Sequence, residues 1–421
     1  MKKTGTKRRS VPTKKRSEPL GKQGPMLSRR AMRLEVSPTV AMAAQATALK
    51  RQGVRVYDFS VGEPDQGTPP HVAAAGVAAI EAGQTRYAPA PGLPELRAAV
   101  AARYRKDFQV AFAPEEVAIT IGGKQALYLA CQALLDPGDE VIVPSPYWPT
   151  FTEAVRLAGG RPALVPAREA DGFAITDRLV ARGVGPRTRA VIVNSPCNPT
   201  GAVTGPEALR ALGRLAKRRG FTLIYDDTYA QLAFDRPADV GLQALRDLLG
   251  DRLVILGTAS KSYCMTGWRI GWVLGPRALV DACAALASHS TQSPATFAQA
   301  GAVTALNGPQ EFVGELLAEY RRRRDFVHPA LAAIPGVTCG KPQGGFYAFP
   351  NVTRCLSLEV PTSLELGRRL LEEKHVAVVP GEGFGAPGYF RLSFARPMEE
   401  LREGVRRIAE FLTERRGGGQ T

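Results

Sequence analysis

Lys261 lies in a short polar segment whose residue types suit a reaction of its amine beside a bound anion. Residues 254–256 are apolar and predict a buried strand that stops at Gly257, which puts Lys261 on the following loop. Thr258 precedes the lysine by three residues, and Arg269 follows it by eight, beyond a glycine turn. Because a hydroxyl and a guanidinium bind anions, the segment suits an amine that forms an imine with a phosphorylated aldehyde. The alternative is a surface lysine ahead of a strand turn.

Two loops that follow predicted strands offer surfaces for an anion and for a flat ring. Gly122-Gly123-Lys124 stands where a strand turns into a helix, so free backbone N–H groups and the helix dipole favour a phosphate there. Trp148 follows the next strand and could stack on a heterocycle. Each loop also has an ordinary structural explanation, because paired glycines tighten turns and aromatic residues cap sheet edges.

Three further strands carry polar side chains that can orient a ligand. Asn198 lies in the segment 194–201, where two prolines and a glycine fix the loop. Asp226 ends a buried strand and needs a donating partner such as a protonated pyridine nitrogen, and Tyr229 could then reach the phenolic oxygen of the same ring. Arg391 lies inside an apolar strand, where its planar fork fits a carboxylate. A turn, a helix cap and a structural salt bridge are the respective alternatives.

Strand-like and helical runs alternate through the middle of the chain, which predicts an α/β fold with a mostly parallel sheet. In such sheets ligands bind beyond the carboxyl ends of the strands, where most of these polar residues lie. A second, α+β lobe follows in the sequence. The predicted strands are residues 117–121, 140–143, 161–165, 190–194, 222–225, 254–256 and 270–274, with a short strand at 54–61 before them and a long helical region at 309–333, an extended segment at 337–349 and a closing helix from 399 after them.

The basic charge of the chain is concentrated at its N-terminal end. The formal net charge is +16, and residues 1–25 hold nine lysines and arginines against one glutamate. This tail lacks hydrophobic patterning, so we expect it to be disordered. It is either a basic arm for acidic partners, or a dispensable extension or misread start ahead of Met26.

Six cysteines and four histidines show no spacing typical of a metal site. Cys131 and Cys283 fall in apolar helical patterns and are expected in the core. We therefore expect a reduced, cytoplasmic protein without a structural metal. No apolar run is long enough to span a bilayer, so we expect no membrane association.

The order of the motifs along the chain is more specific than any one of them. This order resembles that of the fold-type I pyridoxal-phosphate enzymes of the class I/II aminotransferase family, from about residue 27 to about residue 409. The resemblance implies a large three-layer αβα domain that binds the cofactor, residues 76–308. A smaller α+β domain would be formed by the arm and segment 26–75 together with residues 309–415, and residues 1–25 and 416–421 would be tails.

The resemblance implies a role for each residue around pyridoxal 5′-phosphate (PLP). Lys261 would hold the cofactor as a Schiff base and later move the substrate Cα proton. Asp226 would keep the ring nitrogen protonated, Tyr229 and Asn198 would bind the phenolic oxygen, and Trp148 would stack on the ring. The phosphate would be bound by Thr258, Arg269, the backbone at Gly123 and Lys124, and Tyr87 of the partner subunit.

The resemblance also implies how an amino-acid substrate is recognised. The residues that would bind its α-carboxylate end are Arg391, Asn198, Trp148 and the backbone at Gly62. The Gly-Gly-Lys-Gln loop and Ser37-Pro-Thr39 resemble the bacterial and archaeal aspartate/prephenate branch, in which Lys124, Ser37 and Thr39 would read a distal carboxylate. Segment 288–295 contains no arginine, so the distal arginine of the animal-type branch is missing. Thr258 stands where serine is usual and keeps its hydroxyl, and Asp227 stands where glutamate is common, a change we expect to be tolerated.

These implications predict a homodimeric aminotransferase of amino-acid metabolism that passes the amino group of L-aspartate to 2-oxoglutarate, giving oxaloacetate and L-glutamate. Three alternatives stay open at this point. The substrate could be prephenate or an aromatic or neutral amino acid, with Lys124 idle. The cofactor could support another reaction, such as β-elimination or decarboxylation. The chain could be a regulator that binds nucleic acid through its basic tail, although no helix-turn-helix precedes the fold.

Overall fold

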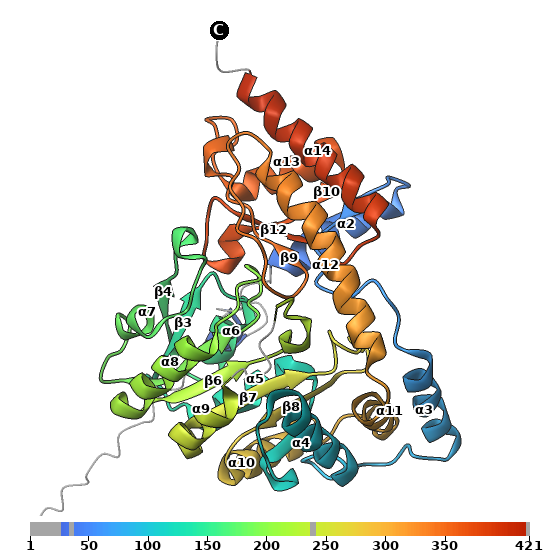
Figure 1. Cartoon of the computed structure of the whole chain (residues 1–421), viewed down its shortest axis with the longest axis vertical. Helices are drawn as coiled ribbons and strands as arrows, with labels where there is room; N and C mark the ends of the chain where they lie inside the picture. Colours follow the sequence, from blue (N-terminus) through green and yellow to red (C-terminus); the bar gives the residue numbers. More distant parts are fainter. Residues whose placement is uncertain (1–26, 33–37, 236–240, 418–421) are drawn as a thin grey trace, which may run out of the picture. The chain divides into compact units, whose positions relative to one another are not determined.

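The computed structural model describes residues 27–32, 38–235 and 241–417 of the chain. The chain divides into two compact units, Met1–Glu35 and Val36–Thr421. In the first unit the described residues form one short helix, α1 (Arg29–Met32). The predicted disorder of residues 1–25 lies outside the described part. The second unit holds the rest of the fold (Figure 1).

A seven-stranded sheet forms the centre of the larger lobe, with the strand order β2-β8-β7-β6-β5-β3-β4. Only β8 runs antiparallel to its neighbours, so the predicted mostly parallel sheet is confirmed. The central strands β6 and β7 are buried along their whole length, which explains their nearly continuous apolar sequences. They are β2 (Val117–Ile121), β3 (Glu140–Ser145), β4 (Arg161–Pro166), β5 (Thr188–Asn194), β6 (Thr222–Asp226), β7 (Leu253–Thr258) and β8 (Ile270–Leu274).

Helices cover both faces of this sheet and make the three-layer αβα arrangement. One hydrophobic cluster joins one face to helices α5 (Gly122–Leu134), α6 (Thr150–Leu157) and α10 (Arg277–Ser288). A second cluster joins the other face to five helices and to α3 (Pro70–Glu81). Those five are α4 (Pro94–Phe108), α7 (Asp177–Ala181), α8 (Pro206–Arg219), α9 (Leu242–Leu249) and α11 (Thr296–Asn307). The layers fix the carboxyl ends of the parallel strands at one edge.

The smaller lobe combines short strands with helices from both ends of the sequence. A two-stranded sheet pairs β1 (Tyr57–Asp58) with β10 (Val376–Ala377), and a three-stranded sheet has the order β11-β12-β9. The latter strands are β11 (Val379–Pro380), β12 (Phe390–Ser393) and β9 (Tyr347–Ala348). Helices α2 (Pro38–Arg51), α13 (Ser363–Lys374) and α14 (Met398–Gly417) pack around them.

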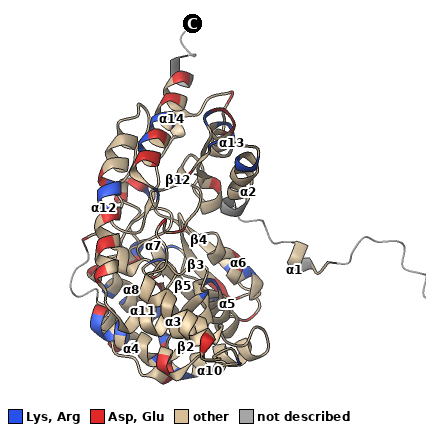
Figure 2. Ribbon diagram, turned by 90° about the vertical axis from the view of Figure 1, so that its right-hand side faces the viewer, with Lys and Arg blue, Asp and Glu red and all other residues tan. Residues whose placement is uncertain are grey.

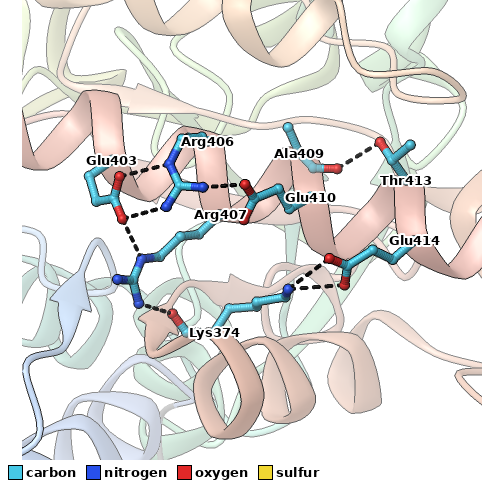
Figure 3. A network of polar contacts seen from close by, with 8 residues as sticks. All are labelled: Lys374, Glu403, Arg406, Arg407, Ala409, Glu410, Thr413 and Glu414. Carbon is cyan, nitrogen blue, oxygen red and sulfur yellow. Dashed lines mark hydrogen bonds and ion pairs between the residues drawn. The ribbon is translucent and has the colours of Figure 1, made fainter.

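Helix α12 (Glu311–Ala332) runs between the two lobes and packs beside α14 (Figures 1 and 2). The end of α13 is fastened to α14 by Lys374, which pairs with Glu414 at 2.9 Å and accepts a hydrogen bond from Arg407 at its carbonyl oxygen (Figure 3). Arg407 also pairs with Glu403 on its own helix. These partly exposed pairs contribute little free energy each, so the apolar face of α14 does most to hold it on the lobe.

Three predicted boundaries are wrong in detail. The strand expected at 54–61 is reduced to β1, because only Tyr57 and Asp58 find a pairing partner in β10. The extended segment at 337–349 pairs only at β9 and at isolated bridges of Thr338 and Gly344. Thr258 belongs to strand β7 itself, since it pairs with Gly271 of β8. No helix among the described residues is both long and apolar enough to cross a membrane.

The pairing of β7 with β8 predicts a strict requirement for glycine at position 271. A Cβ atom there would lie 2.5 Å from the backbone carbon of Gly122 and 2.6 Å from the nitrogen of Gly123. These backbone atoms cannot move out of the way as a flexible side chain could. We therefore expect Gly271→Ala to lower the free energy of unfolding by about 1–3 kcal/mol in urea titrations. Gly267→Ala is the matched control, because nothing lies within 4 Å of its Cβ position. Equal stability of the two variants would contradict this packing.

Candidate active site

A cavity of about 340 Å³ opens at the carboxyl ends of the parallel strands and continues against the smaller lobe. It brings together residues that are far apart in the sequence, from α2 to β12. Most of the predicted site residues line it: Gly62, Gly123, Lys124, Trp148, Asn198, Asp226, Tyr229, Thr258, Lys261, Arg269 and Arg391.

The Lys261 amine is held inside this cavity at the end of the loop that leaves β7. Its Nζ donates a hydrogen bond to the carbonyl oxygen of Gly62 at 2.8 Å. Removal of the amine from water lowers the pKa of Lys261 to about 8, against the opposing effect of Glu63. The neighbouring cations, Arg391 first among them, lower the pKa further. The lysine is therefore largely a neutral nucleophile above a pH of about 8, rather than above its usual 10.5, and its burial excludes the interpretation as a surface lysine.

Asp226 ends strand β6 with its carboxylate buried against the cavity. Its Oδ1 accepts a hydrogen bond from the backbone N–H of Thr228 at 3.0 Å. Burial raises the pKa of Asp226, and no cationic side chain among the described residues pairs with it. A buried carboxylate in this state favours a protonated nitrogen donor from a ligand.

Tyr229 and Asn198 reach the same wall from two neighbouring loops. The Tyr229 hydroxyl shares a 2.8 Å hydrogen bond with the hydroxyl of Tyr347, and burial raises the pKa of Tyr229 well above its usual value. Asn198 is fixed by its backbone N–H, which donates to Oδ1 of Asn194 at 2.8 Å. Both side chains are therefore oriented before any ligand arrives.

Arg391 is a fully buried cation whose hydrogen bonds are incomplete. Its Nη1 donates to Oδ1 of Asn198 at 3.0 Å and its Nη2 to the carbonyl oxygen of Ser60 at 2.7 Å. Its Nε has no hydrogen-bond partner among the described residues, and no carboxylate there forms an ion pair with it. Its guanidinium lies 4.5 Å from the centre of the Tyr347 ring. A structural salt bridge is thus excluded within the described chain, and the free donor fits an incoming carboxylate.

The opposite end of the cavity has the donors for a phosphate. Gly122 has a φ of +75°, and a Cβ there would lie 2.5 Å from Nη2 of Arg269, so only glycine lets the guanidinium approach the start of α5. The hydroxyls of Thr258 and Ser260 lie 2.8 Å apart beside it. A helix N-terminus, two hydroxyls and an arginine together suit a phosphate dianion.

Lys124 and Trp148 form one side of the cavity. The Lys124 ammonium lies 5.4 Å from the centre of a Trp148 ring, and the pKa of Lys124 is lowered by partial removal from water and then by Arg269. Trp148 packs edge-on against Phe151 of α6, with ring centres 5.5 Å apart. The indole position is therefore fixed by the large lobe.

Three predicted site residues are not among those that line the cavity. Tyr87 is 91% exposed. Ser37 lies outside the described residues, and Thr39 is described only as part of the backbone of α2. Helix α2 nevertheless reaches the cavity through Ala43.

Sequence reasoning missed several residues that line the cavity. Tyr347 contacts both Arg391 and Tyr229, and it follows a Gly-Gly-Phe run that looks like an ordinary loop. Glu63 sits beside the predicted Gly62 and was not singled out. An aromatic residue behind paired glycines would have been the only signal for Tyr347. The others are Ala43, Val61, Asn194, Thr228, Ser260 and Thr266.

Comparison with known proteins decides the family of this site. The family model for aminotransferase class I and II matches residues 54–408. The chain belongs to the class I and II aminotransferases. This aminotransferase is 41% identical to an aspartate aminotransferase of Geobacillus stearothermophilus over 92% of its own length and 99% of that protein. It is 42% identical to the aspartate/prephenate aminotransferase of Thermus thermophilus, over 92% of its length and 98% of that protein.

Solved structures agree with this assignment. An aspartate aminotransferase from Thermus thermophilus with maleate matches with a TM-score of 0.87 at 42% identity, covering 92% of this aminotransferase and 100% of that chain. The aspartate aminotransferase of Rhizobium meliloti matches with a TM-score of 0.88 at 38% identity, covering 93% and 99% of the two chains. The predicted fold-type I architecture is confirmed.

The family uses PLP as its cofactor, and the cavity fits that group. The buried Asp226 carboxylate lacks a cation, while Arg269 and the start of α5 provide an anion site at the other end. The Lys261 amine lines the same cavity. A ring nitrogen, a phosphate and an aldehyde therefore each have a complementary group.

The lowered pKa of Lys261 predicts the pH dependence of PLP capture by the cofactor-free enzyme. The amine is the reactive form, so we expect the capture rate to rise about tenfold per pH unit below pH about 8 and to level off above it. Stopped-flow absorbance of bound PLP measures this rate. A short lysine peptide is the control, and its rate should rise until the ordinary lysine pKa near 10.5. A similar late plateau in the enzyme would contradict the burial of Lys261.

Proposed function

We propose that this aminotransferase passes the amino group of L-aspartate to 2-oxoglutarate by a ping-pong mechanism, giving oxaloacetate and L-glutamate. The charge inventory of the cavity carries the proposal. Four cationic side chains line it, Lys124, Lys261, Arg269 and Arg391, against the carboxylates of Asp226 and Glu63. The excess is two positive charges. A phosphate dianion and the two carboxylates of a dicarboxylic substrate would bring four negative charges, and a protonated ring nitrogen and the substrate ammonium would bring two positive ones, so that the charges balance.

Each of the four cations then has one role. Arg269 takes the phosphate with Thr258, Ser260 and the backbone at Gly123 and Lys124, and Arg391 takes the substrate α-carboxylate together with Asn198 and the backbone at Gly62. Lys261 is the reacting amine. Lys124 is left for the distal carboxylate, which is the feature that separates aspartate from neutral amino acids.

Bound PLP would supply an electron-withdrawing ring that accepts the charge left when the substrate Cα loses its proton. Asp226 would keep the ring nitrogen protonated, while Tyr229 and Asn198 would hold the phenolic oxygen and Trp148 would cover one ring face. The Lys261 amine would lie beside the substrate Cα and could move its proton. Its lowered pKa suits that role, because a neutral amine is needed to accept a proton near neutral pH.

Helix α2 would complete the distal end of the substrate site. Ala43 of this helix lines the cavity, and Thr39 lies one helical turn before it. With Ser37 it would add hydroxyls beside Lys124. The Thermus thermophilus aspartate aminotransferase has been solved with maleate, a dicarboxylate, which supports a dicarboxylate ligand.

We further propose a homodimer in the cytoplasm. Tyr87 is 91% exposed, which suits a side chain that reaches the phosphate of a second copy's active site. None of the six cysteines, all of which lie in the described residues, forms a disulfide, and five are buried, as expected in a reducing compartment.

Replacing Lys124 tests the dicarboxylate assignment. We expect Lys124→Gln to lower kcat/KM for L-aspartate roughly 10- to 100-fold, because a charge-assisted hydrogen bond is lost. The kcat/KM for L-alanine should change less than about threefold. Lys217→Gln, an exposed lysine on α8, is the matched control and should change neither. If aspartate and alanine lose the same factor, Lys124 does not read the distal carboxylate, and a neutral or aromatic substrate becomes the better assignment.

Mixed dimers test the shared active site. A dimer of one Tyr87→Phe chain and one Lys261→Ala chain would have one intact site, with Lys261 from the first chain and Tyr87 from the second. We expect such heterodimers, isolated by two affinity tags, to bind one PLP with wild-type affinity, and Tyr87→Phe homodimers to bind PLP more weakly. Unchanged PLP affinity in the Tyr87→Phe homodimer would show that the tyrosine does not reach a partner's site.

A further inference from the structure

The loop that follows β1 forms part of the cavity wall and has little freedom to move. Val61, Gly62 and Glu63 line the cavity, and the Gly62 carbonyl oxygen accepts the hydrogen bond from Lys261. A Cβ atom at Gly62 would lie only 2.5 Å from the hydroxyl of Tyr347, so the backbone is close against that ring. A small displacement of this loop would thus change the surroundings of the reacting amine directly.

The far end of the loop is fixed by a buried ion pair outside the cavity. Asp65 Oδ1 lies 2.8 Å from Nη1 of Arg323 on α12, and the two side chains are 14% and 7% exposed. The Nε of the same arginine donates to Glu319 at 2.7 Å, one turn earlier on the helix. The guanidinium group of Arg323 therefore binds one carboxylate through Nη1 and another through Nε. The Asp65–Arg323 pair is largely shielded from water and salt.

Helix α12 also holds the segment that follows Tyr229. Arg321 pairs with Asp235 at 2.8 Å and donates to the carbonyl oxygen of Phe234. This helix runs between the two lobes and packs beside α14 of the smaller one (Figure 1). One helix is thus tied by neighbouring arginines to two segments that carry cavity residues.

We propose that Asp65 and Arg323 are positioning residues that hold the Gly62–Glu63 backbone against Lys261. Through this ion pair, the position of α12 determines the geometry of the substrate site. Neither residue lines the cavity, so the effect passes through the loop. The inference rests on the proposed aminotransferase function, but it is independent of which amino acid is the substrate.

Two consequences follow from a loosened loop. The carbonyl oxygen of Ser60 holds Nη2 of Arg391, so binding of every substrate that carries an α-carboxylate would weaken. Glu63 raises the pKa of Lys261, whereas Arg391, Arg269 and Lys124 lower it. With the amine still buried, retreat of Glu63 and of the Gly62 carbonyl would therefore destabilise the ammonium form and move the pKa of Lys261 downward.

The experiment compares Asp65→Asn, Arg323→Gln and the double variant with Arg322→Gln. Arg322 is the matched control, because it is the neighbouring arginine on α12 and pairs with the same Glu319 but not with Asp65. The readouts are the pH midpoint of PLP capture by the cofactor-free protein, and kcat and KM for L-aspartate and L-alanine. Asp65→Asn preserves side-chain shape and the Arg323–Glu319 pair, so it remains informative if Arg323→Gln folds poorly.

We expect Asp65→Asn and Arg323→Gln each to lower the pH midpoint and to reduce kcat/KM roughly tenfold for both amino acids, mostly through KM. The double variant should be no worse than either single one, and Arg322→Gln should match the wild type. Unchanged midpoints and KM values in Asp65→Asn, or losses that add in the double variant, would overturn the proposal. A wrong substrate assignment would instead alter the aspartate-to-alanine ratio in the wild type and leave the midpoint shift intact.

Discussion

The burial of cationic side chains at one end of the sheet is the constraint on which the site depends. Arg391 is 2% exposed, has a free Nε and pairs with no carboxylate among the described residues, which is costly without a ligand. Burial also lowers the pKa of Lys261 to about 8, and the neighbouring cations act in the same direction. Anion binding and amine reactivity therefore have one physical origin, and the strands and helices around the cavity serve to maintain it.

Strands of both lobes hold the charged groups of the site in fixed positions. The large lobe fixes Lys261, Asp226 and Arg269 at strand ends, where backbone pairing leaves little freedom. The smaller lobe contributes Arg391 on β12 and Tyr347 on β9, which are adjacent strands. Ping-pong chemistry needs one site that accepts two substrates in turn, and the α-carboxylate clamp and the distal contact proposed for Lys124 would meet that need.

The order of motifs predicts the parallel sheet and most of the cavity, because each motif follows a buried strand whose pattern is local. Contacts that depend on the tertiary path could not be predicted in this way. Asp65 and Arg323 look like ordinary surface charges in the sequence, and only folding brings them to 2.8 Å. The only local signal for Tyr347 is its place behind paired glycines, and β1 proved short because strand length depends on a partner, β10, from the far end of the chain. The role proposed for Tyr87 likewise depends on a second copy.

Transfer of a labelled amino group tests the central claim most directly. The enzyme, loaded with PLP, would be mixed with ¹⁵N-labelled L-aspartate, an equal concentration of unlabelled L-alanine and 2-oxoglutarate, and the products followed by NMR and mass spectrometry. The account predicts ¹⁵N-labelled L-glutamate and an equal amount of oxaloacetate, with little pyruvate. Unlabelled glutamate with matching pyruvate, and no label transfer from aspartate, would contradict it.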